Sequence, residues 1–137
     1  MKLYFAGSIR GGRADAALYA RLIARLKERH TILTEHVGAP SAFPTVEKGM
    51  TDAEIWAQDM AWLRECDAVI AECSTPSLGV GYELAMAQQW GKPAHIFFDA
   101  RRGVLSAMLT GDPYYHIHIY RDEDDLLRRL DAALESL

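Results

Sequence analysis

The stretch Thr75-Pro76-Ser77-Leu78-Gly79-Val80-Gly81-Tyr82-Glu83 decides how this chain is interpreted. An apolar run at residues 68–71 precedes it and a helix-like segment at residues 84–90 follows it, so the sequence predicts a strand, a glycine-bearing turn and a helix. Such a turn leaves backbone N–H groups pointing outward at the positive end of a helix dipole, where anions bind. Ser77 adds a hydroxyl donor and Glu83 adds a carboxylate. We therefore predict that the turn holds a phosphate while Glu83 acts on another atom of the same molecule.

Strand-like and helix-like segments alternate along the chain. We predict strands at residues 2–6, 31–35, 68–72, 94–98 and 114–120, and helices at residues 14–29, 51–65, 84–90, around 104–108, and 122–137. This alternation is typical of an α/β fold, in which helices cover both faces of a mostly parallel, here five-stranded, sheet. A length of 137 residues fits one domain, residues 1–137.

Composition narrows the classes of function. The net charge of −4 argues against a broad nucleic-acid-binding surface, although local donors can still bind a small anion. Cys66 and Cys73 have neither CxxC nor zinc-site spacing, so we interpret them as reduced, mostly buried thiols of a cytoplasmic protein. We expect no signal peptide, because the first strand begins at Lys2, and no membrane segment, because no apolar run is long enough.

Ligands of parallel α/β sheets bind beyond the carboxyl ends of the strands. Residues 7–10, His36 and residues 77–83 each follow a predicted strand, so we expect them to meet at one edge of the sheet. Arg10 lies among glycines and can reach an anionic ligand. Residues 37–50 have no periodicity and form a predicted loop, either a lid or binding loop or a loose surface connection.

The predicted helix at residues 51–65 supplies a second carboxylate. It starts with the capping box Thr51-Asp52-Ala53-Glu54. Asp59 lies within the apolar stripe of this helix, which is made of Trp56, Met60 and Leu63. Partial desolvation there would raise the pKa of Asp59 and suit it to hold or pass a proton. The alternative is an ordinary helix acid that caps a neighbouring backbone group.

Other polar side chains also have structural interpretations. Tyr4 is compatible with a half-buried strand residue, Arg10 with a solvated loop charge and His36 with a structural histidine. His116 and His118 share one face of the last predicted strand, but two histidines without further ligands do not make a metal site. We therefore predict no metal.

Five blocks, in the same order, resemble the 2′-deoxynucleoside 5′-monophosphate N-glycosidases of the nucleoside 2-deoxyribosyltransferase superfamily. They are YFAGSIRGGR at residues 4–13, LTEHV at 33–37, QD at 58–59, PSLGVGYEL at 76–84 and VLSAM at 104–108. Together they extend over nearly the whole chain. Residues 38–50 carry no such match, so the sequence leaves the base preference open.

This resemblance implies a flavodoxin-like or Rossmann-like three-layer sandwich, a homodimer, and hydrolysis of the bond between base and deoxyribose without metal or organic cofactor. Glu83 would be the nucleophile at C1′, Asp59 the proton-handling carboxylate near the base, and Tyr4 would orient Glu83. The matched blocks imply a set of substrate-binding residues: Gly7, Ser8, Ile9, Arg10, His36, Ser77, Gly79, Ser106 and Met108. Ser106 would reach the phosphate of a deoxynucleoside 5′-monophosphate from the partner subunit.

Three alternatives remain. A deoxyribosyltransferase would pass the sugar to a second base instead of water, and Ser77, Arg10 and Ser106 argue for the hydrolase because they suit a phosphorylated substrate. An N-glycosidase of ribonucleotides such as CMP is the second, since nothing in the sequence measures room for a 2′-hydroxyl. A nucleotide sensor is the third, but a sensor needs the anion seat and not both Glu83 and Asp59.

Overall fold

The computed structural model describes residues 1–10, 12, 14–39 and 49–137. Its five strands are β1 (Lys2–Ala6), β2 (Thr31–Ile32), β3 (Ala68–Glu72), β4 (Ala94–Asp99) and β5 (His116–Tyr120). They form one sheet of order β2-β1-β3-β4-β5, in which every pair of neighbours is parallel. This is the flavodoxin-like order, and its switch point lies between β1 and β3. The predicted α/β fold is confirmed; that residues 1–137 form one domain stays a prediction.

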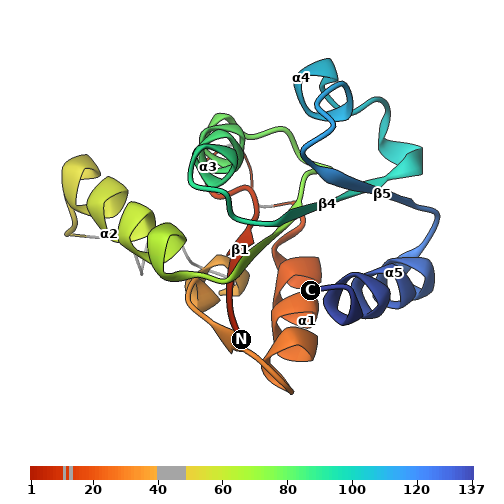
Figure 1. Cartoon of the computed structure of the whole chain (residues 1–137), viewed down its shortest axis with the longest axis horizontal. Helices are drawn as coiled ribbons and strands as arrows, with labels where there is room; N and C mark the ends of the chain where they lie inside the picture. The colour runs from red at the N-terminus through yellow and green to blue at the C-terminus, as the bar shows by residue number, and fades with distance from the viewer. Residues whose placement is uncertain (11, 13, 40–48) are drawn as a thin grey trace.

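Helices cover both faces of this sheet (Figure 1). Helices α1 (Ala16–Lys27) and α5 (Glu123–Glu135) lie on one face, and α2 (Asp52–Glu65) and α3 (Leu78–Gln89) lie on the other. The short helix α4 (Ala107–Thr110) lies in the connection between β4 and β5. Two 3₁₀ turns, η1 (Glu35–Gly38) and η3 (Ala100–Arg102), complete the described elements. The layers are therefore helix, sheet and helix.

Alternate strand residues supply two separate cores. Leu3 and Phe5 of β1 pack with α1 and α5, whereas Tyr4 and Ala6 of the same strand pack with α2 and α3. β3 and β4 are buried along their whole length for the same reason. A strand covered on both faces is apolar almost without interruption, as the runs at residues 68–71 and 94–98 are.

Helix α3 starts earlier than predicted. It begins at Leu78 rather than at residue 84, so Gly79 and Gly81 lie in its first turns and not in a turn before it. Neither has a positive φ. Ser77 explains the difference, because its hydroxyl oxygen accepts a hydrogen bond from the Val80 N–H at 3.3 Å and caps the helix. A serine cap offsets the roughly 1 kcal/mol that a glycine costs inside a helix.

Strand β2 is shorter than the predicted strand at residues 31–35. Beyond Ile32, the hydroxyl of Thr34 bonds both the N–H and the carbonyl of Phe5, at 2.9 and 2.7 Å. A side chain thus replaces the backbone partner that a longer strand would provide, and the chain turns into η1. Smaller shifts place the starts of α1, α4 and β5 at residues 16, 107 and 116.

Two further predictions concern the helix start at residue 51 and membrane segments. The capping box is confirmed, because Thr51 accepts from the Glu54 N–H at 3.1 Å and its hydroxyl contacts the Glu54 carboxylate at 3.1 Å. Across residues 1–10, 12, 14–39 and 49–137, none of the helices has the length and apolar character needed to cross a bilayer.

The strand histidines form a cluster with a third imidazole. His95 of β4 stacks on His116 and bonds His118, with 2.9 Å between the two ring nitrogens. Burial and the two neighbouring rings lower the pKa of His95 to about 4, so it is neutral at physiological pH. Within the described residues, no group of three or more histidine, cysteine or carboxylate side chains has the geometry of a metal site.

Candidate active site

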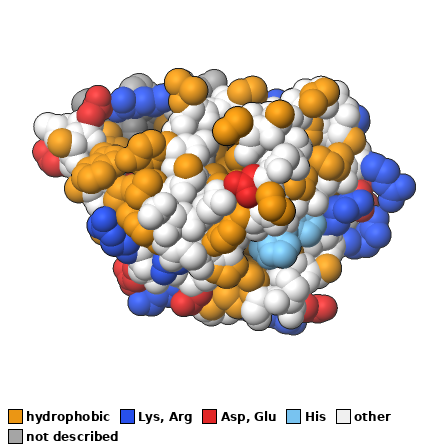
Figure 2. All heavy atoms as spheres, turned by 45° about the horizontal axis from the view of Figure 1, so that its top comes forward, with side chains coloured by type: hydrophobic (Ala, Val, Ile, Leu, Met, Phe, Trp, Pro, Cys, Tyr) orange, Lys and Arg blue, Asp and Glu red, His pale blue; other side chains and the backbone are white. Residues whose placement is uncertain are grey.

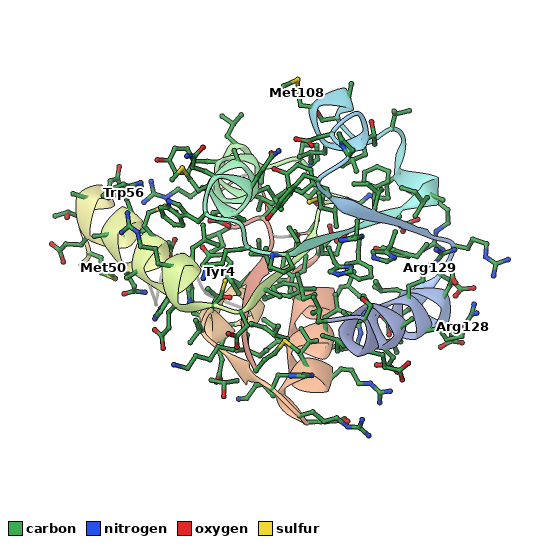
Figure 3. The ribbon with its side chains drawn as sticks, in the orientation of Figure 1. Tyr4, Met50, Trp56, Met108, Arg128 and Arg129 are labelled. Atoms are coloured by element: carbon green, nitrogen blue, oxygen red, sulfur yellow. The ribbon has the colours of Figure 1, made fainter. Side chains whose placement is uncertain are left out.

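A cleft of about 700 Å³ opens between α2, α3 and the carboxyl end of β1. It brings together seven of the predicted site residues: Gly7, Ile9, Arg10, Asp59, Ser77, Gly79 and Glu83. Figure 3 labels Trp56, which lines this cleft from α2, and the buried Tyr4 of β1. Segments that are far apart in sequence therefore meet where the sheet topology places them, beside the switch point.

Glu83 and Asp59 both line this cleft, and the charge of Asp59 acts on Glu83. Glu83 comes from the second turn of α3 and is partly exposed, whereas Tyr4 of β1 is buried and donates its hydroxyl hydrogen bond to the Glu83 carboxylate. Burial, with the charge of Asp59 as a second cause, raises the pKa of Glu83 to about 8, against a small opposing effect of the Tyr4 hydrogen bond. Burial beside these two carboxylates also raises the pKa of Tyr4 well above its usual range, so Tyr4 stays a donor.

A small recess of about 20 Å³ adjoins the two carboxylates on the side of β1 and η1. Tyr4, Asp59 and Glu83 line it together with His36. The His36 ring lies 5.6 Å from the ring of Trp62, between centroids. His36 is therefore close to the carboxylate pair, as predicted, although it reaches the recess and not the main cleft.

The start of α3 also lines the cleft. Ser77 is its cap, and the N–H of Gly79 belongs to the first turn, where helix N–H groups lack partners within the helix. Arg10 lines the same cleft, and its guanidinium pairs with the carboxylate of Asp52 at 2.9 Å. The residues of the predicted anion-binding site thus include a helix start and an arginine. Gly79 lies inside the helix and not in a turn before it.

Two predicted residues of the β1 segment have different environments. A Cβ atom at Gly7 would lie 2.8 Å from the Tyr19 ring, so only glycine allows Tyr19 to pack this close to the end of β1. Ser8 is fully buried and is not among the residues that line the cleft. Its N–H donates to the Tyr19 hydroxyl at 3.1 Å. In this structure Ser8 therefore contributes to the packing of the segment.

Ser106 and Met108 lie apart from the cleft of their own chain. Ser106 caps α4, accepting a hydrogen bond from the Met108 N–H at 3.3 Å. Met108 is 82% exposed, and Figure 3 shows it at the outer end of α4, far from Tyr4 and Trp56. The single chain does not bring these two residues to the carboxylates.

Seven cleft residues were not predicted as site residues, and three of these have polar side-chain groups: Asp52, Trp56 and Tyr82. Trp56 was expected within the apolar stripe, but it is 54% exposed and its indole N–H donates to the Tyr82 hydroxyl at 3.2 Å. Met60 and Leu63 of that stripe are buried. The sequence spacing indicates this position of Trp56, because Trp56 precedes Asp59 by one helical turn and so shares its side of α2.

The loop between β3 and Ser77 is held from the other face of the sheet. Glu72 is 1% exposed, and its Oε1 accepts from the Ser74 N–H at 2.8 Å and lies 3.5 Å from the Tyr120 hydroxyl. Ser74 in turn accepts from the Asp99 N–H at 2.9 Å. Thr75 donates to Asp15 at 2.6 Å. Contacts from α1, β4 and β5 therefore position the loop that ends at the α3 cap.

Comparison with known proteins places this chain in a family. The nucleoside 2-deoxyribosyltransferase family model matches residues 3–133. The 5-hydroxymethyl-dUMP N-hydrolase of Mus musculus is 50% identical over 111 residues, which make up 80% of this chain and 64% of the mouse protein. The chain therefore matches slightly less than two thirds of that relative. The 5-hydroxymethyl-dUMP N-hydrolase of Tetraodon nigroviridis is 46% identical over 124 residues, which are 89% of this chain and 87% of the fish protein.

Solved structures share the fold at lower sequence identity. A CMP N-glycosidase of Clostridium botulinum superposes with a TM-score of 0.69 at 20% identity, covering 96% of this chain and 99% of its own. A 2-deoxyribosyltransferase of Bacillus psychrosaccharolyticus gives a TM-score of 0.66 at 19% identity, covering 92% and 90%. These likenesses concern the arrangement of the helices and strands.

Proposed function

The chain belongs to the nucleoside 2-deoxyribosyltransferase family, and we propose that it hydrolyses the N-glycosidic bond of 2′-deoxynucleoside 5′-monophosphates. The products are a free base and 2-deoxyribose 5-phosphate. One observation carries the proposal: two carboxylates, Glu83 and Asp59, line a single cleft that is also lined by the capped start of α3 and by Arg10. The names of the mouse and fish relatives support the same reaction.

Glu83 is the proposed nucleophile. A carboxylate oxygen of Glu83 attacks C1′, the bond from C1′ to the base nitrogen breaks, and its electron pair leaves with the base. Water then attacks C1′ of the glycosyl-enzyme, which releases the sugar phosphate and restores the Glu83 carboxylate. Tyr4 holds Glu83 in place through its hydrogen bond. Two displacements at C1′ retain its configuration.

Asp59 is the proposed acid for the departing base. A base leaves more easily once it is protonated, and a carboxylic acid of raised pKa can supply that proton at neutral pH. The charge of Asp59 contributes to raising the pKa of Glu83 to about 8, so the pair is proposed to hold one proton near neutrality. The reactive arrangement places that proton on Asp59 and leaves Glu83 ionised.

The 5′-phosphate is proposed to bind at the start of α3. Ser77, Gly79 and Arg10 line the same cleft as the two carboxylates and are the proposed phosphate ligands. Gly7 and Ile9 line the sugar side, and His36 is assigned to the base side through the recess. Binding the phosphate away from C1′ positions the reacting atom against Glu83.

A homodimer is proposed to complete this phosphate site with Ser106 of a second copy. Three large apolar side chains are almost fully exposed: Leu78 at 96%, Val104 at 95% and Met108 at 82%. Figure 2, turned to bring the α3 and α4 side forward, shows apolar side chains scattered over this face. Burial of such side chains against a second copy would stabilise a dimer and bring its α4 to the cleft.

Mixing two inactive variants tests the shared site. Glu83→Ala and Ser106→Ala damage different halves of it, so a mixed dimer contains one intact site and one doubly damaged site. After subunit exchange at equal concentration, activity should rise to about a quarter of the wild-type value, because about half of the dimers are mixed. No recovery, with dimers present by analytical ultracentrifugation, would place Ser106 outside the partner's site.

The reaction itself is tested by chromatography of released bases. Each deoxynucleoside 5′-monophosphate is compared with its unphosphorylated nucleoside and with its ribonucleotide. Release from the phosphorylated deoxy compounds only, abolished in Glu83→Ala, is the expected result. Base exchange with unphosphorylated nucleosides would instead identify a transferase, release from CMP a ribonucleotide N-glycosidase, and tight binding without release a sensor.

The cytoplasm is the proposed location. Both cysteines are free and buried, and burial raises the pKa of the Cys66 thiol to about 11. Free thiols are usual in a reducing compartment. Fractionation of cells that produce the protein checks this assignment.

A further inference from the structure

Arg10 and Asp52 form an ion pair across the mouth of the cleft. The guanidinium Nη2 lies 2.9 Å from the Asp52 Oδ1, and both residues line the cleft. Arg10 follows β1, whereas Asp52 is the first residue of α2. The contact therefore joins the proposed phosphate ligand to the helix that carries Asp59.

Asp52 is not needed to start its helix. The start of α2 is capped by Thr51, whose partner is Glu54. The side chains of Arg10 and Asp52 are 54% and 83% exposed. An ion pair this exposed stabilises a protein by at most about 1 kcal/mol, because water competes for both partners. The pair can therefore be opened at low cost.

A phosphate is a better partner for Arg10 than Asp52 is. It carries close to two negative charges at neutral pH, and its oxygens accept two parallel hydrogen bonds from one guanidinium. We propose that Asp52 is an exchange partner that holds Arg10 in the free protein and gives it up to the 5′-phosphate. This inference rests on the proposed function, in which Arg10 binds that phosphate.

Competition from Asp52 would weaken binding of the phosphate group of both the substrate and the product. The product 2-deoxyribose 5-phosphate carries the same phosphate as the substrate, so a site that gripped it too well would release product slowly. When Asp52 pairs with Arg10 again, the product phosphate loses this contact and dissociates more readily. Asp52 thereby becomes a residue that sets KM and product inhibition without contacting the reacting atoms.

Asp52→Asn tests the exchange through the binding of inorganic phosphate, measured by isothermal titration calorimetry. The variant should bind phosphate two- to fivefold more tightly, the fold-change that corresponds to an exposed pair of up to about 1 kcal/mol. KM for the deoxynucleotide should fall by a similar factor while kcat stays constant or decreases. Unphosphorylated deoxynucleoside should bind equally well to both proteins.

Two comparisons separate exchange from a general effect of charge. Glu54→Gln removes one negative charge from the same helical turn, keeps an acceptor for the capping box and should leave phosphate binding unchanged. In an Arg10→Gln background, Asp52→Asn should bring no gain, because no guanidinium is left to release. Because Asp52 is exposed, its replacement should preserve the fold, which circular dichroism checks; Asp52→Ser serves as a second variant.

The proposal is overturned if Asp52→Asn leaves phosphate binding unchanged or weaker, if Glu54→Gln tightens it equally, or if the gain persists without Arg10. Base release is measured separately with the same proteins. Tighter phosphate binding without any base release would support the exchange and remove the proposed hydrolysis. Normal base release with unchanged phosphate binding would support the proposed hydrolysis and overturn the exchange.

Discussion

Glu72 and Glu83 lie on opposite faces of the sheet, Glu72 as the last residue of β3 and Glu83 in the second turn of α3. Desolvation raises the pKa of both carboxyl groups. Glu72 lies among Ser74, Tyr120 and other packed groups, and within the described residues its Oε2 has no hydrogen-bond partner. Glu83 instead borders a cleft of about 700 Å³. A raised pKa is thus shared by a residue that holds a loop and a residue placed for chemistry.

Access to a cleft and the presence of a cation distinguish the two sites. The charge of a neighbouring carboxylate raises the pKa of both, Asp59 for Glu83 and Asp15 for Glu72, but Arg102 opposes the rise only at Glu72. A substrate can reach Glu83 and none can reach a side chain that is 1% exposed. A shifted pKa identifies a candidate active-site residue only when its side chain also borders a cleft.

Glu83→Gln should produce the largest effect. Without a nucleophilic carboxylate, kcat/KM should fall by at least about a thousandfold, while the amide keeps the contact with Tyr4 and the protein stays folded. Base release and chemical denaturation measure the two properties. The distinction between the two glutamates would be wrong if Glu83→Gln kept its activity, or if Glu72→Gln lowered kcat/KM as much as Glu83→Gln does.

Glu72→Ala should chiefly destabilise the protein. It removes the acceptor of the Ser74 N–H and leaves a small cavity, so the free energy of unfolding should fall by about 2–3 kcal/mol. The kcat/KM of the folded fraction should stay within about tenfold of wild type, since the loop is displaced but the carboxylate pair remains. Urea denaturation checks the first expectation. Unaltered stability with lost activity would give Glu72 a direct part in the reaction.

The pH profile should report the proton shared by Glu83 and Asp59. The proposed reaction needs one ionised carboxylate and one protonated one, so it needs the pair with a single proton. The last proton leaves at a pKa of about 8. Above that pH, kcat/KM should decline about tenfold per pH unit. A rate that rises up to pH 8 and then stays constant would mean that only the ionised Glu83 matters and that Asp59 donates no proton.

Tyr4→Phe sharpens this profile. The Tyr4 hydrogen bond lowers the pKa of Glu83, so its loss should move the alkaline decline to higher pH. The ionised nucleophile would also be less populated, and kcat should fall severalfold. An unshifted profile would remove Tyr4 from its assigned positioning role.

The free energy of unfolding should depend on pH through Glu83. The pKa of this group is about 8 in the folded state, against an ordinary value of 4.5. The folded state therefore binds more protons between these values, and its stability decreases as pH rises from about 4.5 to about 8, by at most about 1.4 kcal/mol per pH unit. Glu83→Gln lacks this dependence, so its advantage over wild type should grow over that range. Parallel curves for the two proteins would contradict the raised pKa.

The sequence was sufficient for those parts of the fold and site that follow from periodicity and strand ends. Alternating strands and helices predicted the parallel sheet, and the position of residues after strand ends predicted that Gly7 and Glu83 would meet. The start of α3 was misjudged because two glycines suggested a turn, whereas the cap provided by Ser77 decided the conformation. Strand β2 was overestimated because the hydroxyl of Thr34 occupies the backbone groups of Phe5.

Contacts between distant residues were beyond sequence reasoning. Nothing local to Arg10 indicates a partner 42 positions away, and the ion pair with Asp52 exists only because the sheet order places β1 beside α2. The exposure of Trp56 was missed because an aromatic residue on an apolar stripe normally belongs to the core. The parts assigned to Ser106 and Met108 depend on a second copy and stay predictions.

The burial of both cysteines makes this protein convenient for site-directed labelling. Cys66 and Cys73 are inaccessible to thiol-reactive dyes while the protein is folded. A single cysteine introduced at exposed Ala57, on α2 beyond Asp52, would then carry a fluorophore without removal of either native thiol. Its emission would follow the first turns of α2 in real time as phosphate enters and leaves, so the exchange of Arg10 between its two partners becomes a signal that can be timed.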